Sequence, residues 1–159
     1  MIAAPAVEPL AAAGTRVRLG FDLASISGIA GSIRHFGRRF TDRFFTGGEL
    51  DYALSGTGVC AERLAARFAA KEAVIKALAL SEAGIGFRDI EVVKDAGGGC
   101  AIVLHGEAKR IADGMGVRQL LVSLSHDGDC AGAVVHAWLD PLSPNLNPNT
   151  KTKHGQHAH

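Results

Sequence analysis

The sequence predicts one α+β domain in which an antiparallel sheet packs against one long helix and several shorter helices. Three observations predict it: an alanine-rich helical stretch lies near the middle of the chain, strand-like runs fill most of the second half, and no regular βαβ repeat connects them. The length of 159 residues suits a single domain with a hydrophobic core. No internal repeat is visible, so a duplicated architecture is not expected.

The first elements follow from changes in the spacing of the apolar residues. Residues 17–21 alternate, which predicts a strand that delivers Asp22 at its end. From 26 to 45 the apolar residues recur at three- and four-residue steps. This spacing predicts amphipathic helix, and Gly37 is the expected break within it.

Two local signals precede the longest helix. Thr46 and Glu49 have the spacing of a capping box, in which Thr46 caps a short helix and Glu49 reaches back to its start. The run Ser-Gly-Thr-Gly at 55–58 predicts a break. The longest helix is then expected from about 60 to 80, because residues of high helix propensity dominate there.

The second half of the chain predicts four strands and one helix. The strands are expected at 89–94, 101–105, 120–124 and 131–138. A glycine-rich turn at 95–99 makes a hairpin of the first two strands. A short helix at 107–115 is expected to end at Gly116.

The two ends of the chain differ in composition from the domain expected at 16–140. Residues 1–15 are rich in alanine and proline but lack a positive start, so a flexible extension is expected rather than an export signal. Residues 141–159 are polar, which predicts a disordered tail. The three histidines of that tail have no fixed geometry that would favour a metal site.

Composition excludes some classes of function. The formal net charge is +1, which gives no sign of nucleic-acid binding. No stretch approaches the ~18 apolar residues of a membrane span, so no membrane partner is expected. Cys60, Cys100 and Cys130 are widely spaced, which predicts small buried thiols in a reducing cytoplasm rather than a disulfide frame or a zinc site.

Candidate chemistry begins on the longest helix. Glu72 shares a helical face with apolar Phe68 and with Lys76, so its carboxylate lies at the border of the core and needs a charge partner. An exposed Glu72–Lys76 pair, worth only ~0.3–0.5 kcal/mol, is the simple structural alternative. Asp22 has a similar alternative as a cap or turn residue. Read together, Asp22 and Glu72 offer two carboxylates, which suits Mg²⁺ bound with a polyphosphate.

The run Phe-x-x-Lys-Glu-Ala-x-x-Lys at 68–76, after Gly-x-Asp at 20–22, resembles the phosphopantetheinyl transferase superfamily. Chain length is similar to its short, single-repeat type, holo-[acyl-carrier-protein] synthase. The resemblance covers roughly residues 18–138 and is strongest at 67–76. It implies the α+β fold of that superfamily. It also implies transfer of 4'-phosphopantetheine from coenzyme A to a serine hydroxyl of an apo acyl carrier protein, with release of 3',5'-ADP.

The resemblance implies roles for the candidate residues. Asp22 and Glu72 would hold Mg²⁺, and Lys76 would stabilise the phosphoryl oxygens as a catalytic and cofactor-binding residue. Glu72 or a metal-bound water would take the serine proton, and the sequence leaves both open. Family members of this length form homotrimers with coenzyme A in the cleft between subunits. The resemblance also implies a cytoplasmic enzyme of fatty acid biosynthesis and lipid metabolism.

Three further residues are similar to cofactor-binding positions of the family. Arg67 is expected against a phosphate of the nucleotide end of coenzyme A, with a solvated helix charge as its alternative. Gly84 resembles a glycine turn that lets backbone amides approach the cofactor, although it also suits a plain turn. His126 is expected near the cofactor phosphates, with a hydrogen-bonded surface histidine as its alternative.

Other polar residues have less definite expectations. Lys71 matches the family motif, but it could equally pair with Glu62 or Asp22. His105 and His136 lie in strand-like patterns without matching partners and are expected to be structural.

The sequence departs from the family pattern at four places. Ser25 replaces an acidic residue, Gly28 replaces an arginine, Gly-Gly-Cys stands at 98–100 where Gly-Lys/Arg-Pro is common, and Cys130 replaces a tyrosine. These departures bear on partner recognition more than on chemistry. They keep open a non-catalytic coenzyme A-binding or structural relative within a larger synthase. A magnesium-dependent nucleotide hydrolase is a third option.

A group of arginines offers a substitute docking surface for an acidic carrier protein. The group consists of Arg34, Arg38, Arg39 and Arg43, with Asp42 as the only opposing charge. Complementary charge chiefly raises the encounter rate and sets orientation. A solvated helix face is the alternative.

Overall fold

The computed structural model describes residues 14–55 and 60–141. The tail histidines, and nearly all of the two segments predicted to be flexible ends, lie outside the described residues. Within the described part the predicted α+β fold is confirmed. A three-stranded antiparallel sheet, in the order β1-β5-β4, is formed by β1 (Arg16–Ser25), β4 (Val117–Asp127) and β5 (Cys130–Leu139). A separate antiparallel hairpin is formed by β2 (Ile90–Lys94) and β3 (Cys100–Leu104).

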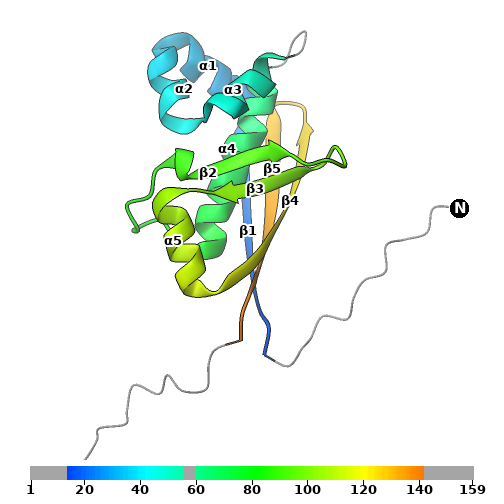
Figure 1. Ribbon diagram of the computed structural model, residues 1–159. Coiled ribbons are helices and arrows are strands. Elements are labelled where there is room, and N and C mark those ends of the chain that lie inside the picture. Colours follow the sequence, from blue (N-terminus) through cyan, green and yellow to red (C-terminus); the bar gives the residue numbers. More distant parts are fainter. Residues whose placement is uncertain (1–13, 56–59, 142–159) are drawn as a thin grey trace, which may run out of the picture.

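The long helix α4 (Cys60–Leu78) lies between the three-stranded sheet and the hairpin (Figure 1). Three helices gather near its first turns, namely α1 (Ile26–Phe36), α2 (Arg38–Phe44) and α3 (Gly47–Leu54). A single 3-10 turn, η1 (Phe87–Asp89), leads into the hairpin, and α5 (Gly106–Met115) follows it. Among the described residues, no helix is long and apolar enough to cross a membrane.

Most predicted elements form where they were expected. The helical region 26–45 is broken at Gly37, and the capping box of Thr46 and Glu49 is present with both of its hydrogen bonds. Helix α5 ends at Gly116 in the left-handed conformation. The largest differences lie in the sheet, where β1 and β4 are longer than predicted.

Asp22 is not at the end of its strand, as was predicted. Strand β1 continues to Ser25, and Asp22 pairs with Ala133 of the neighbouring strand β5. The continuation has a physical reason: Ala24, two residues after Asp22, lies on the same side of the strand and is buried in the core. Asp22 therefore faces the helix side from a rigid position in the sheet.

The close approach of α4 to β1 depends on one glycine. Buried alanines line the face of α4 toward the sheet and let the strand come near. A Cβ atom on Gly20 would lie only 1.8 Å from the carbonyl oxygen of Ala73, which no side chain can tolerate. Gly20 thus brings the strand that carries Asp22 against the helix that carries Glu72.

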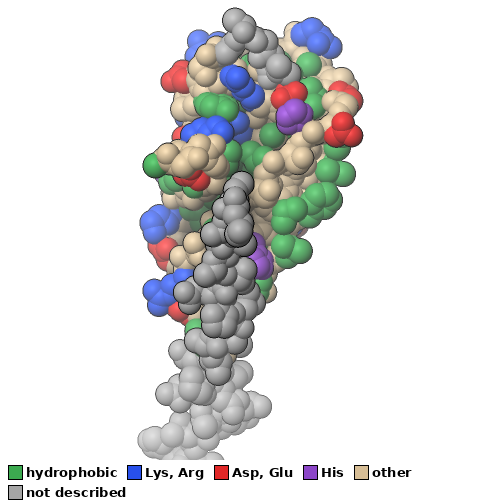
Figure 2. Space-filling model, turned by 90° about the vertical axis from the view of Figure 1, so that its right-hand side faces the viewer, with side chains coloured by type: hydrophobic (Ala, Val, Ile, Leu, Met, Phe, Trp, Pro, Cys, Tyr) green, Lys and Arg blue, Asp and Glu red, His purple; other side chains and the backbone are tan. Residues whose placement is uncertain are grey.

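The outer face of the three-stranded sheet is apolar but is not covered by any other part of the described chain. Leu19 is 65% exposed, and Phe21 and Leu23 are also more than half exposed. Leu121 of β4 and Val134 of β5 add to the same face. Figure 2 shows hydrophobic side chains gathered along one edge of the molecule.

Candidate functional site

A carboxylate from the sheet and two charged residues from α4 form the first candidate site. Asp22 Oδ1 lies 2.5 Å from the Nζ atom of Lys76, which also donates a 3.3 Å hydrogen bond to the carbonyl oxygen of Phe21. The hydrogen bond to Asp22 raises the pKa of Lys76 above its usual value. The predicted alternative of a Glu72–Lys76 pair is therefore wrong, because Lys76 reaches across to the sheet instead.

The charges of Asp22 and Lys76 both act on the carboxylate of Glu72. Burial raises the pKa of Glu72 above its usual value, and the negative charge of Asp22 raises it further, while Lys76 opposes the shift. Two carboxylates that repel one another beside a single lysine favour the arrival of a further cation. Residues 22, 72 and 76, separated in the sequence, are thus brought together.

Gly84 lies next to Glu72. Both residues line a cavity of about 270 Å³ together with Ile75 and Phe87. Gly84 has φ +68°, a conformation that side chains rarely adopt, and the space beside it is open. The predicted glycine turn therefore exists and exposes backbone at the edge of the carboxylate site.

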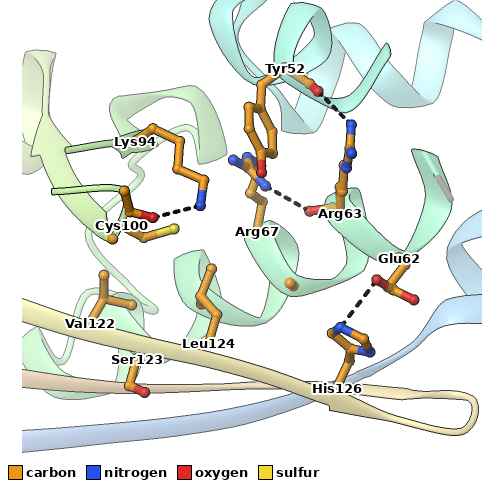
Figure 3. Close-up of a pocket in the computed structure, with 13 residues that line it drawn as sticks. Tyr52, Glu62, Arg63, Arg67, Lys94, Cys100, Val122, Ser123, Leu124 and His126 are labelled. Atoms are coloured by element: carbon orange, nitrogen blue, oxygen red, sulfur yellow. Dashed lines mark hydrogen bonds and ion pairs between the residues drawn. The ribbon is translucent and has the colours of Figure 1, made fainter. Parts of the chain in front are cut away.

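Arg67 and His126 line a different cavity, of about 470 Å³, that shares no lining residue with the first (Figure 3). Arg67 is only 3% exposed, so its predicted alternative as a solvated charge is wrong. Its guanidinium lies 4.1 Å from the centre of the Tyr52 ring, and its Nη1 donates to the carbonyl oxygen of Arg63 at 3.2 Å. His126 is half exposed and lies 3.2 Å from Glu62 Oε1.

Sequence reasoning missed Tyr52, Arg63 and Lys94, which line this second cavity. They come from α3, α4 and the end of β2, and nothing in their local patterns marks them as neighbours. Only the tertiary fold brings them together. A signal was available for Arg63 alone, because it stands one helical turn before Arg67.

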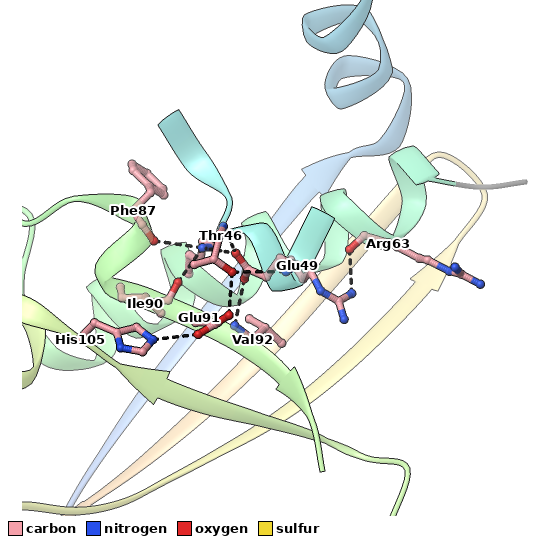
Figure 4. Close-up of polar contacts among 10 residues, drawn as sticks. Thr46, Glu49, Arg63, Phe87, Ile90, Glu91, Val92 and His105 are labelled. Atoms are coloured by element: carbon pink, nitrogen blue, oxygen red, sulfur yellow. Dashed lines mark hydrogen bonds and ion pairs between the residues drawn. The ribbon is translucent and has the colours of Figure 1, made fainter. Parts of the chain in front are cut away.

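The sequence suggested Glu62 or Asp22 as the partner of Lys71, but Lys71 pairs with neither. Its amine is completely buried 2.8 Å from Glu49 Oε2 and donates to the carbonyl oxygens of Phe87 and Ile90 at 3.0 and 2.6 Å (Figure 4). Burial lowers the pKa of Lys71, and the charge of Glu49 opposes that shift. Lys71 is therefore part of the interior.

The same polar network continues to the surface. Glu91 accepts a hydrogen bond from the Thr46 hydroxyl at 2.7 Å and lies 2.8 Å from His105 Nε2. The bond from Thr46 is the main cause that lowers the pKa of Glu91, and His105 adds to the effect. His105 thus has a structural contact, as predicted, and His136 accepts a hydrogen bond from the indole of Trp138.

Ser25, one of the departures from the family pattern, has a structural role. Its hydroxyl caps α1 by accepting from the backbone N–H of Gly28 and donates to Asp129 at 2.9 Å. Asp129 also receives hydrogen bonds from the backbone and hydroxyl of Ser27, and these bonds lower its pKa. The start of α1 is thereby tied to the β4–β5 turn.

The cysteines differ from the prediction. All three are free, but Cys60 and Cys100 are only half buried and Cys130 is exposed. Cys130 stands at the first position of β5, beside the turn, where its side chain has little to pack against. In residues 14–55 and 60–141, no cluster of three or more histidine, cysteine or acidic residues is arranged to hold a metal, so Asp22 and Glu72 remain a pair.

The sequence and the fold of this chain are similar to those of known proteins. Residues 18–129 match the sequence pattern of the 4'-phosphopantetheinyl transferase superfamily. The chain is 44% identical over 118 residues to holo-[acyl-carrier-protein] synthase of Gloeobacter violaceus, covering 74% of this chain and 89% of that one. It is 41% identical over 117 residues to the Koribacter versatilis protein of the same name, covering 73% and 93%. The crystal structure of Helicobacter pylori holo-[acyl-carrier-protein] synthase in complex with coenzyme A is similar with a TM-score of 0.63 and 31% identity, covering 75% and 98%.

Proposed function

This chain belongs to the 4'-phosphopantetheinyl transferase superfamily, and we propose that it is a holo-[acyl-carrier-protein] synthase. It transfers 4'-phosphopantetheine from coenzyme A to a serine hydroxyl of an apo acyl carrier protein and releases 3',5'-ADP. One observation carries the proposal. Asp22 of β1 meets Glu72 and Lys76 of α4, in a cluster that can hold a divalent cation and a pyrophosphate.

The residues of this cluster fit Mg²⁺. Asp22 and Glu72 would supply oxygen ligands from a strand and a helix. Burial raises the pKa of Glu72 and repulsion from Asp22 raises it further, and a cation between the two carboxylates would relieve that repulsion. Mg²⁺ held by these two carboxylates would neutralise charge on the pyrophosphate of coenzyme A. No third protein ligand is required, because Mg²⁺ commonly keeps waters and substrate oxygens.

The remaining steps of the reaction depend on side chains and backbone of this chain. The serine oxygen of the carrier protein attacks the phosphorus atom next to pantetheine, and the bond to the bridging oxygen of 3',5'-ADP breaks. Lys76, half exposed and held by Asp22, stabilises the phosphoryl oxygens as charge develops on them. Glu72, whose pKa is raised, is one candidate acceptor for the serine proton. Open backbone at Gly84 leaves room for the substrate beside Glu72.

The nucleotide end of coenzyme A belongs, in this proposal, to the cavity of Arg67 and His126. Arg67 is buried and cationic, and that cavity also carries Arg63 and Lys94. This cavity and the Glu72 cavity share no lining residue, and in this proposal coenzyme A extends from the Arg67 cavity of one copy to the carboxylates of the next. We therefore propose a homotrimer with coenzyme A bound in the cleft between neighbouring subunits.

The exposed apolar face of the three-stranded sheet supports this assembly. A monomer rarely leaves several neighbouring large apolar side chains in water. The face follows β1, the strand that carries Asp22, so burying it against another copy brings a neighbour close to the carboxylates. The homotrimer would therefore complete the site as well as cover the face.

Leu19→Glu is expected to break the homotrimer and to abolish transfer, because it places charge at the centre of the apolar face. Leu19 is exposed in one subunit, so the fold itself should survive. Sedimentation velocity and a transfer assay measure the two effects. Leu54→Glu, at an exposed leucine of α3, is the matched control. A Leu19→Glu chain that remains a trimer would contradict this interface.

The carrier protein is proposed to dock on the arginine surface of α1 and α2. All four arginines of that surface are exposed, and Arg38 has a long 3.6 Å contact with Asp42. Arg39 and Arg43 flank an apolar hollow of about 260 Å³ lined by Phe36, Phe40 and Phe44. Acidic side chains with an apolar centre are the complement of such a surface.

Reversing Arg39 and Arg43 to Glu is expected to raise the KM for the carrier protein by about tenfold or more, with less effect on kcat. The change alters encounter and orientation rather than the reacting groups. Steady-state kinetics at two salt concentrations measure it, because the wild-type KM should rise with salt. A matched control reverses Lys109 and Arg110 of α5, which are also exposed. Equal KM values for both double variants would reject the arginine surface.

Intact-mass spectrometry of an apo acyl carrier protein tests the function. With this chain, coenzyme A and Mg²⁺, the carrier protein should gain the mass of one phosphopantetheine. Binding of coenzyme A without any gain, for several carrier proteins, would favour the non-catalytic relative. Release of 3',5'-ADP without a carrier protein would favour the hydrolase.

We further propose that the enzyme works in the cytoplasm and serves fatty acid biosynthesis within lipid metabolism. Three free cysteines, one of them exposed, suit a reducing compartment. Purified fatty-acid carrier protein is therefore the first acceptor to test.

A further inference from the structure

Three cations surround the ring of Tyr52 in the larger cavity. The guanidinium carbons of Arg67 and Arg63 lie 4.1 and 5.2 Å from the ring centre, and the Nζ atom of Lys94 lies 5.7 Å from it. Figure 3 shows Arg67 against the ring, with Arg63 of α4 and Lys94 of the hairpin on either side of Tyr52. Tyr52 itself stands on α3, so the ring joins three elements of the fold.

None of these three cations has a carboxylate partner within the part of the chain that the structure describes. Arg63 donates to the carbonyl oxygen of Tyr52 at 3.1 Å, and Lys94 donates to that of Gly98 at 2.9 Å. Glu62 lines the same cavity, but its carboxylate is engaged with His126. The cavity therefore has an excess of positive charge.

Arg67 is the most constrained of the three. Its side chain is almost fully buried, and its Nε atom has no hydrogen-bond partner among the described residues. A buried cation with a hydrogen bond unmade is unfavourable by itself, and Arg63 one turn away repels it. The face of the Tyr52 ring, which is electron-rich, is the group that attracts it.

We infer that Tyr52 is a positioning residue for the binding of coenzyme A. Its ring holds Arg67, and with it Arg63 and Lys94, ready for the 3'-phosphate at the nucleotide end of the substrate. The inference rests on the proposed function, in which the pyrophosphate goes to Asp22, Glu72 and Lys76, so that the 3'-phosphate is the anion left for this cavity. An aromatic ring suits the task because it holds cations together without neutralising them.

The Tyr52 hydroxyl has no part in this role, so the ring can be tested separately from it. Tyr52→Phe keeps the ring and should bind 3',5'-ADP as the wild type does, within about twofold. Tyr52→Leu removes the ring and should weaken 3',5'-ADP binding by about tenfold. Adenosine 5'-monophosphate, which lacks the 3'-phosphate, should bind equally well to both variants. Isothermal titration calorimetry measures these constants without any transfer reaction.

Two results of the titrations would overturn the inference. Unchanged binding of 3',5'-ADP to Tyr52→Leu would show that Arg67 does not need the Tyr52 ring to bind the 3'-phosphate. Equal weakening of both nucleotides would show that the ring serves the adenosine part or the fold. An Arg67→Ala background adds a sharper test, because Tyr52→Leu should then weaken 3',5'-ADP binding by clearly less than it does in the wild type, with only Arg63 and Lys94 left for the ring to hold.

A second measurement needs no variant and so does not depend on whether Tyr52→Leu folds. Tyr52 is the only tyrosine of the chain, so a ring-labelled tyrosine gives signals from this site alone in NMR spectra. Addition of 3',5'-ADP should shift these signals more than adenosine 5'-monophosphate does. Equal shifts would contradict the inference.

The two proposals fail in different ways. A wild-type chain that transfers phosphopantetheine and binds 3',5'-ADP, but with no dependence on the ring, rejects only the role of Tyr52. A chain that neither transfers nor binds 3',5'-ADP rejects the proposed function, and the role of Tyr52 with it.

Discussion

Glu72→Gln is expected to reduce phosphopantetheine transfer by roughly a thousandfold or more, because it removes one of the two carboxylates proposed to hold Mg²⁺. The amide has the size of the carboxylate but not its charge. The mass of an apo acyl carrier protein, followed over time with coenzyme A and Mg²⁺, measures the loss. Glu107→Gln, at an exposed position of α5, is the matched control and should transfer normally.

The same substitution should not destabilise the fold. Burial and the charge of Asp22 both disfavour the ionised Glu72, as its raised pKa shows, so a neutral amide relieves a cost of the unliganded protein. The melting temperature of Glu72→Gln without Mg²⁺ should equal or exceed that of the wild type. Addition of Mg²⁺ and coenzyme A should then stabilise the wild type more than the variant. If Glu72→Gln transferred phosphopantetheine as fast as the wild type, the proposed role of the Glu72 carboxylate would be wrong.

Much of the fold could be predicted because the periods of apolar residues are local. The break at Gly37, the capping box at Thr46 and the end of α5 at Gly116 all depend on residues within one or two turns. The extension of β1 beyond Asp22 could not be predicted in this way. It depends on pairing with β5, more than a hundred residues later, and on burial of Ala24.

Asp22, Glu72 and Lys76 were expected together from the family resemblance, because spacing alone relates only the two residues of the helix. Glu72 and Lys76 share one helical face, and the strand that holds Asp22 meets that helix through Gly20. Arg67 was expected to bind a phosphate, but its burial and its contact with Tyr52 were not visible. Such contacts depend on where α3 packs, which no local pattern encodes.

The misassigned partner of Lys71 has the same cause. The sequence offered Glu62 and Asp22, whereas the structure pairs Lys71 with Glu49, the residue that completes the capping box of α3. A cap glutamate is usually exposed, yet this one is completely buried because β2 covers it. One residue thus serves both the start of a helix and the interior.

Lys71→Met is expected to lower the free energy of unfolding by about 3–5 kcal/mol, the usual cost of removing one partner from a buried ion pair. The amine of Lys71 has three acceptors, namely Glu49, Phe87 and Ile90, of which Glu49 and Ile90 are buried and Phe87 is partly buried. Methionine is similar in length but leaves the Glu49 charge without its cation. Urea denaturation at a fixed protein concentration measures the change.

Two variants serve as controls for this loss. Lys109→Met removes an exposed lysine that pairs with Asp113 on α5, and it should cost no more than about 0.5 kcal/mol. Glu49→Gln combined with Lys71→Met removes both charges. Glu49 accepts from the backbone N–H groups of Val92 and Thr46 on different oxygens, so the single amide oxygen of glutamine keeps only one of these two hydrogen bonds. The double variant should recover part of the stability that Lys71→Met loses.

The double variant also distinguishes two reasons for a buried ion pair. If it recovers part of the stability lost by Lys71→Met but transfers poorly, Lys71 and Glu49 serve to position η1, whose Phe87 lines the cavity of Glu72. If it is unstable and also transfers poorly, the pair is needed for the fold itself. The first result is expected, because removing both charges leaves no buried charge without its partner. That result would show that Lys71, which does not contact the substrate in the proposed mechanism, helps to position the phosphoryl-transfer site.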